Sequence, residues 1–112
     1  MSAELRTWIE GTMHLLSTEE GGRETPAITT DGKYRPQLYV EDTDVSTSLF
    51  LYKVTGKEWL APGESGEFVG ALLSPQLVGD ALQPNAKFKI REGRKVVGEV
   101  RIAKIWTTNE PI

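Results

Sequence analysis

Side chains alternate in character with a period of two over long stretches of this chain. Between Thr7 and Leu16 the two alternating sets are Ile9, Gly11, Met13 and Leu15 on one side, and Trp8, Glu10, Thr12 and His14 on the other. A period of two places such sets on opposite faces of an extended strand, whereas a helix repeats every ~3.6 residues. The pattern therefore predicts a half-buried strand over Thr7–Leu16.

Glycine and proline divide the rest of the chain into short segments. The stretch Ser17–Pro26 is polar and contains two glycines, and Pro62–Gly63 fits the centre of a type II turn. Between Pro75 and Pro84 there is room for a short helical turn but for no long helix. Alternating segments between the turns predict further strands at Gln37–Val40, Ser46–Val54, Glu67–Ser74, Lys87–Arg91 and Lys95–Trp106. Six or more short strands indicate an all-β barrel or sandwich.

Composition excludes several classes of protein. The chain has 112 residues, which corresponds to one domain over 1–112, with no cysteine and one histidine, His14. Disulfides, thiolate metal sites and cysteine nucleophiles are thereby excluded. Neither a catalytic carboxylate pair nor a Ser–His–Asp arrangement stands out, so we expect no enzyme, metal or cofactor. The amino-terminal residues lack the apolar centre of a signal peptide, and no apolar run approaches the ~20 residues of a membrane span. We expect a soluble, cytoplasmic protein.

Charge is distributed unevenly along the chain. The net charge is −3, yet the segment Lys87–Lys104 carries seven basic residues and two acidic ones. A basic segment can attract phosphate, while the acidic remainder weakens non-specific binding to nucleic acid. Scattered lysines on a solvated strand would give the same count, and the sequence does not decide between the two interpretations.

Five short motifs follow one another in an order that resembles a known family. They are Glu20–Pro26 (E-G-G-R-E-T-P), Tyr34–Tyr39 (Y-R-P-Q-L-Y), Thr43–Ser46 (T-D-V-S), Pro62–Gly63, and Ile90–Gly93 with Val97–Gly98 in the closing hairpin. The order and spacing resemble the third, C-terminal domain of bacterial elongation factor Tu over residues 8–106. The resemblance implies a closed six-stranded antiparallel β-barrel, standing as a protein by itself. There is no G-x-x-x-x-G-K-[ST] phosphate loop, so neither GTP binding nor GTP hydrolysis is expected.

The resemblance also implies an RNA-backbone site. In the family this barrel contacts the T-stem of aminoacyl-tRNA through phosphate and ribose. Arg23 matches the family's loop arginine, a phosphate partner, and Gln37 and Ser46 match a glutamine and a hydroxyl residue. Glu92 and Gly93 match the hairpin turn, and Arg94 and Lys95 keep its positive charge. The implied RNA-binding residues are therefore Arg23, Gln37, Ser46, Glu92, Gly93, Arg94 and Lys95.

Several positions depart from the family or favour a structural role. Glu24 stands where bacterial factors usually have histidine, and Glu41 and Asp42 stand where they tend to be basic or neutral, which opposes phosphate binding. We expect Arg35 to pair with an acid such as Asp44. Tyr34 and Tyr39 are expected in the wall or core, the three tryptophans in buried packing, and His14 on the surface.

Two functions from different classes follow. The first is a protein-interaction module, acting as a homodimer or with another chain through the face that a neighbouring domain covers in the full-length factor. The second is a weak binder of tRNA or tRNA-like RNA backbone, linked to translation. The acidic residues Glu24, Glu41 and Asp42, which depart from the family, slightly favour the protein-interaction module. For both functions we expect no catalysis, no bound nucleotide and no membrane association.

Overall fold

The protein is a closed antiparallel β-barrel of six strands, in the order β1-β6-β4-β3-β7-β8. The computed structural model describes residues 6–30, 32–41, 43 and 45–108. The barrel strands are β1 (Arg6–Leu15), β3 (Gln37–Tyr39), β4 (Ser46–Val54), β6 (Ser65–Leu72), β7 (Lys87–Glu92) and β8 (Lys95–Thr108). The expected all-β barrel is thereby confirmed, and the bounds of β4 coincide with those predicted.

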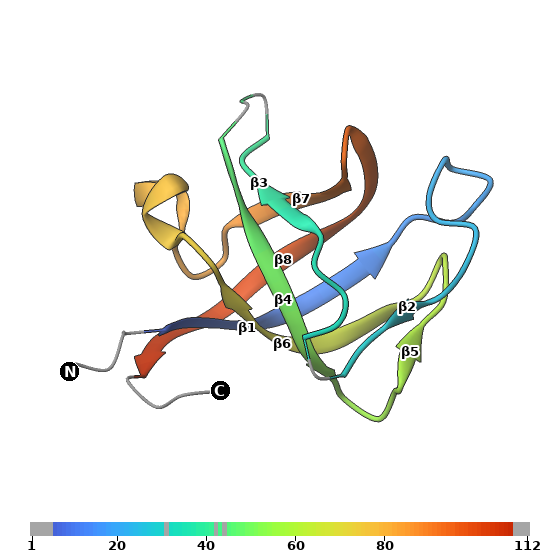
Figure 1. Cartoon of the computed structure of the whole chain (residues 1–112), viewed down its shortest axis with the longest axis horizontal. Coiled ribbons are helices and arrows are strands. Elements are labelled where there is room, and N and C mark those ends of the chain that lie inside the picture. The colour runs from blue at the N-terminus through green and yellow to red at the C-terminus, as the bar shows by residue number, and fades with distance from the viewer. Residues whose placement is uncertain (1–5, 31, 42, 44, 109–112) are drawn as a thin grey trace.

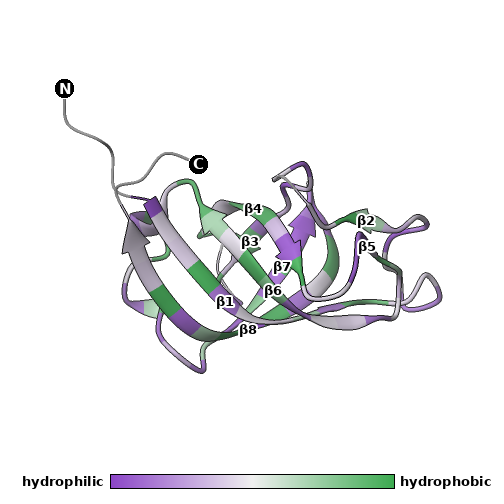
Figure 2. Cartoon of the chain, turned by 90° about the horizontal axis from the view of Figure 1, so that it is seen from below, coloured by the Kyte–Doolittle hydropathy of each residue, from purple (hydrophilic) through white to green (hydrophobic). Residues whose placement is uncertain are grey.

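Alternation along the strands fills the barrel with apolar side chains. Ile9, Met13 and Leu15 of β1 are completely buried, as their shared phase predicts. They pack with large side chains of the other strands, among them Leu38, Leu51, Phe68, Phe88 and Ile102. Figure 2 shows the alternation as bands of apolar and polar colour along β1 and β8. Burial of these side chains is the main stabilising contribution, at about 1.5–3 kcal/mol for each one.

Register shifts interrupt the alternation at three places, and two of them change the face that a valine occupies. One lies between Leu51 and Lys53 on β4, so Val54 is buried although a strict alternation places it opposite Leu51. The other lies between Ile90 and Arg91 on the β7–β8 ladder, and Val97 is buried beside it. A bulge inserts one residue and reverses which face the following side chains occupy. Uninterrupted period-two alternation would place Val54 opposite Leu51 and Val97 opposite Gly98, and both placements are wrong.

A small second sheet lies at one end of the barrel and was not predicted. It pairs β2 (Ala27–Ile28) with β5 (Trp59–Leu60), antiparallel. Ala27 and Leu60 are buried, while Ile28 and Trp59 are exposed. In Figure 1 this sheet lies at the opposite end of the molecule from the start of β1 and the end of β8.

The proline-bracketed segment is helical only in two short pieces. These are the 3₁₀ turns η1 (Pro75–Leu77) and η2 (Gly79–Ala81), as the spacing of the prolines allows. No helix among the described residues is long and apolar enough to cross a membrane. The same residues contain no group of histidine, aspartate and glutamate side chains placed to hold a metal ion.

Candidate functional site

Arg23 joins the Ser17–Pro26 loop to the β7–β8 hairpin. Its guanidinium forms an ion pair with Glu92, and the Tyr34 hydroxyl donates a 2.6 Å hydrogen bond to the same carboxylate oxygen. The guanidinium also lies 4.9 Å from the centre of the Tyr34 ring. We call Arg23, Tyr34 and Glu92 the loop–hairpin contact. Its Arg23–Glu92 pair joins positions that are 69 residues apart in sequence.

The remaining donors of Arg23 are used within its own loop. Nε donates to the Thr25 carbonyl at 3.0 Å, and a terminal nitrogen approaches the Thr25 hydroxyl and the Pro26 carbonyl, each at 3.3 Å. The side chain is 19% exposed. A guanidinium has five N–H donors, and most of them here already have acceptors within the protein. Arg23 is therefore arranged to hold the loop in place.

Burial and the Glu92 carboxylate together determine the pKa shifts in this contact. Burial, followed by the hydrogen bond and the charge of Glu92, raises the pKa of Tyr34 far above its usual range. For Arg23 burial acts to lower the pKa, but the hydrogen bond and charge of Glu92 outweigh it and the net direction is upward. Both groups are thus held in their protonated forms at neutral pH. The expectation that Tyr34 belongs to the core is confirmed by its burial.

Gln37 and Ser46 meet on the outer surface of β3 and β4. The Gln37 amide donates to the Ser48 hydroxyl at 2.9 Å, and the Ser46 hydroxyl donates to the Gln37 carbonyl oxygen at 3.2 Å. All three side chains are half-buried. The structure therefore brings two residues of the implied RNA site together, along with a serine that the sequence did not single out.

Arg91 completes this surface and was missed by the sequence reasoning. It faces Gln37 in the β3–β7 ladder, and its guanidinium lies 4.0 Å from the centre of the Tyr39 ring. Its Nε is buried without a hydrogen-bond partner among the described residues. Gln37, Ser46, Ser48 and Arg91 form the polar face. The signal that could have identified Arg91 was its own place in the Ile90–Gly93 motif, next to Glu92.

The hairpin residues stand away from the polar network. Gly93 has φ of +62°, which favours glycine at this turn, and Arg94 and Lys95 are exposed beside it. Glu24 and Glu41 are also exposed. The structure thus places Gly93, Arg94 and Lys95 at one tip, next to Glu92 in sequence, with the Arg94 and Lys95 side chains exposed.

Aromatic side chains from three strands, β8, β1 and β4, lie on another part of the outer wall. In register, Trp106 of β8 faces Trp8 of β1, Trp8 faces Ala71 of β6, and Ala71 faces Phe50 of β4. The rings of Trp8 and Trp106 stack with centroids 6.3 Å apart, and Tyr52 lies 5.2 Å from Trp8. Trp106, Trp8, Phe50 and Tyr52 form the aromatic row.

The two ends of the aromatic row have different surroundings. Trp106 is 38% exposed, and at the other end Arg35 lies 4.9 Å above the Phe50 ring. Arg35 also donates from Nε to the Gly32 carbonyl at 3.0 Å, while Asp44, its expected acidic partner, lies outside the described residues. Buried packing of every tryptophan was wrong, because Trp59 is 59% exposed on the small sheet.

His14 is less isolated than expected. The residue is half-buried on β1, and its Nδ1 is 2.7 Å from the Ser65 hydroxyl. No carboxylate hydrogen-bonds to the ring among the described residues, so this single hydrogen bond provides no catalytic arrangement.

The geometry defines a closed antiparallel barrel whose outer wall carries a polar face and an aromatic row. Among known families, the model of the elongation factor Tu C-terminal domain matches residues 2–106. The chain belongs to this family of translation-factor domains. The match covers almost the whole sequence and confirms the resemblance that the five motifs indicated.

Proposed function

We propose that this chain is a non-catalytic binding module that docks another protein through the aromatic row. The observation that carries the proposal is the register that aligns Trp106, Trp8 and Phe50 across the sheet, with Trp106 38% exposed at one end. Tryptophan and tyrosine are enriched at the energetic centres of protein interfaces, because they bury a large area with few rotatable bonds.

The surroundings of the row indicate the chemistry of the partner. Arg35 is exposed and lies over Phe50, so its charge borders the apolar surface. A partner with an apolar centre and a carboxylate opposite Arg35 would match both features. A second copy of the chain and an unrelated protein remain alternatives, and sedimentation velocity distinguishes them before a partner is sought.

A site-specific cross-link tests this proposal. We would place a photoreactive phenylalanine analogue at Trp106 and, as a matched control, at Trp59, which is more exposed but lies outside the row. After irradiation in cells of the source organism, we expect one protein product from position 106 that is weakened by Trp8→Ala. Equal products from both positions, or none from position 106, would contradict the proposal.

A second function, weak binding of RNA backbone, is favoured by Arg91. Its guanidinium, whose Nε has no hydrogen-bond partner among the described residues, faces Gln37, whose amide is joined to the hydroxyl groups of Ser46 and Ser48, and these groups suit phosphate and ribose oxygens. Arg91, Arg94 and Lys95 together would make about three phosphate contacts. We therefore expect a dissociation constant in the non-specific range of roughly 10⁻⁴ to 10⁻⁶ M. In this proposal Glu92 and Gly93 shape the hairpin turn, and Arg23 supports the turn through its ion pair with Glu92.

A salt series on a tRNA minihelix tests the RNA function. We expect the logarithm of affinity to fall with a slope of about −2 to −3 against the logarithm of salt. Arg91→Ala should reduce the slope by about one contact, and Glu24→His should tighten binding by removing a carboxylate. Binding at nanomolar strength in physiological salt, or an unchanged slope for Arg91→Ala, would contradict this assignment.

The proposed module neither binds nor hydrolyses GTP. The sequence contains no phosphate loop, so calorimetric titration with GTP or GDP should give no saturable heat at micromolar concentration. A cytoplasmic location is likewise part of the proposal, on the composition and the translation-factor family.

A further inference from the structure

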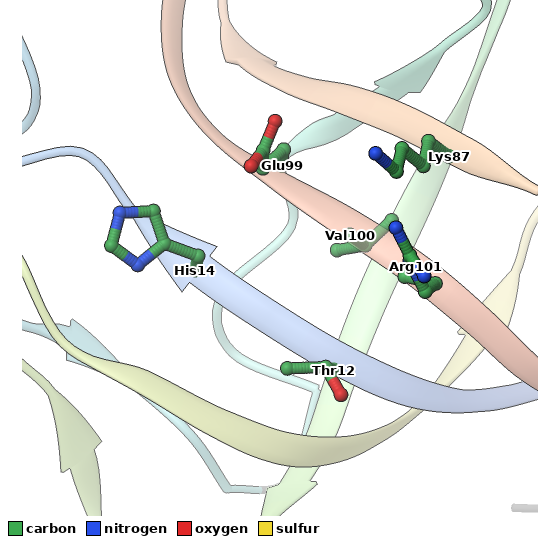
Figure 3. Close-up of a pocket in the computed structure, with 6 residues that line it drawn as sticks. All are labelled: Thr12, His14, Lys87, Glu99, Val100 and Arg101. Atoms are coloured by element: carbon green, nitrogen blue, oxygen red, sulfur yellow. The ribbon is translucent and has the colours of Figure 1, made fainter.

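A shallow groove of about 250 Å³ crosses the outer wall over β1, β8 and β7. Its lining comprises Thr12, His14, Lys87, Glu99, Val100 and Arg101. In Figure 3, Lys87 and Arg101 project from neighbouring strands, with Thr12 on the third strand and His14 and Glu99 toward the other end. None of these residues belongs to the polar face or the aromatic row.

Two cations face each other in this groove. Lys87 pairs with Arg101 in the β7–β8 ladder, and Arg101 pairs with Thr12 in the β8–β1 ladder. Side chains directly opposite on antiparallel strands have Cβ atoms about 5 Å apart, and like charges there destabilise the sheet. Neither side chain forms a hydrogen bond or ion pair with any residue that the structure describes.

The next row along the same strands is arranged differently. There Lys89 faces Glu99 and donates to its carboxylate at 3.1 Å, and this hydrogen bond raises the pKa of Lys89. The Glu99 charge, which also lines the groove, is therefore compensated by Lys89. The excess positive charge stays with Lys87 and Arg101.

We propose that the groove binds a phosphate group, held by Lys87, Arg101 and the Thr12 hydroxyl. A guanidinium offers paired N–H donors that match phosphate oxygens, and an ammonium supplies a mobile point charge. The hydroxyl on the third strand provides a further donor. A bound dianion turns the repulsion between the two cations into attraction to a shared ligand.

The groove is separate from the polar face. Lys87 and Arg91 are four residues apart on β7, which corresponds to roughly 13 Å along the strand. A phosphate in the groove could come from a free phosphate compound or from a nucleic acid backbone. The chemistry of recognition is shared by both sources, so the experiment contains an arm for each.

Inorganic phosphate, followed by ¹⁵N NMR at constant ionic strength, tests the site. We expect saturable shifts centred on the amides of Thr12, Lys87 and Arg101. Lys87→Gln and Arg101→Gln should each weaken binding about tenfold, the effect of losing one charged hydrogen bond. The control is Lys53→Gln, an exposed lysine on β4 that lies outside the groove lining and should bind phosphate as the wild type does.

A second measurement and a second ligand extend the test. Without phosphate and at low salt, Lys87→Gln should raise the melting temperature, because it removes the like-charge pair. If a short RNA hairpin shifts the same amides and Lys87→Gln binds it more weakly, the phosphate belongs to a nucleic acid backbone. If only inorganic phosphate shifts them, the phosphate belongs to a small free compound. Shifts that do not saturate, or an equal loss in Lys53→Gln, would overturn the proposal.

Discussion

The loop–hairpin contact and the aromatic row lie on one barrel but use their side chains in opposite ways. In the contact, Arg23, Tyr34 and Glu92 satisfy one another across the fold, and burial raises the pKa of Tyr34. In the aromatic row, Trp8 stacks on Trp106 and meets Tyr52 in a tilted contact, and Trp106 keeps over a third of its surface in water. The side chains of the loop–hairpin contact bind one another, whereas the aromatic row leaves part of its surface exposed to solvent.

This difference separates residues that maintain the barrel from residues that remain available to a partner. Arg23, Tyr34 and Glu92 all lie in the family motifs, whereas Trp8 and Trp106 lie outside them. Arg91 also lies in a motif, Ile90–Gly93, but its guanidinium stacks on Tyr39 and its Nε has no hydrogen-bond partner among the described residues, so in its contacts it resembles the aromatic row. A residue retained in a motif is thus not, for that reason alone, a ligand contact.

Gly22→Ala should disturb the motif loop most strongly. A Cβ at Gly22 would lie 2.2 Å from the Leu16 carbonyl oxygen, so the backbone itself has to move. We expect a loss of about 3 kcal/mol in the free energy of unfolding, measured by urea denaturation. Gly21→Ala is the control, since open space surrounds it and only its φ of +93° opposes alanine, at about 1 kcal/mol. Equal losses for the two variants would show that close approach is unimportant.

Arg23→Ala and Arg91→Ala should separate stability from binding. Removing Arg23 leaves the Glu92 carboxylate, 35% exposed, without its ion pair, and we expect a loss of about 2 kcal/mol in the free energy of unfolding. Removing Arg91 takes away a stacking contact worth about 0.5–1 kcal/mol. Thermal denaturation measures both, and a larger loss for Arg91→Ala would reverse the assignment of the two arginines.

Tyr34 should give the loop–hairpin contact a dependence on alkaline pH. Its pKa is raised in the folded state, so the native protein holds the phenolic proton more tightly than the unfolded chain, whose tyrosine pKa is about 10. The stabilisation is complete below that pH and is lost as the pH rises beyond it. Urea denaturation between neutral and alkaline pH should show a steeper decline for the wild type than for Tyr34→Phe. Parallel curves would contradict the buried, protonated state.

The fold was largely predictable because period-two alternation and turn residues act locally. The strand Ser46–Val54 was predicted with its observed bounds, and Ile9, Met13 and Leu15 were grouped on one face, which is the buried one. The small β2–β5 sheet was missed because two-residue strands show no periodicity. Closure of the barrel followed from the order of the motifs, which carries information that alternation alone lacks.

The functional surfaces were less predictable because they depend on contacts between distant residues. The Arg23–Glu92 pair joins positions 69 apart, so the sequence suggested a phosphate contact where the structure has an internal partner. Trp106 faces outward because the β1–β8 register shifts between Glu10 and Gly11, which moves the phase of β8 beyond Ile102. Trp8 offered the available signal, since it shares its phase with Glu10, Thr12 and His14.

Measuring stability and partner binding on the same two variants tests the central distinction most directly. Arg23→Ala and Trp8→Ala would each be melted, and each would be combined with the photoreactive residue at position 106. We expect Arg23→Ala to lower the melting temperature but to keep the cross-linked product at temperatures where the variant is folded. We expect Trp8→Ala to lose the product and to change the melting temperature less than Arg23→Ala does. A product that survives in Trp8→Ala and disappears in folded Arg23→Ala would contradict the account.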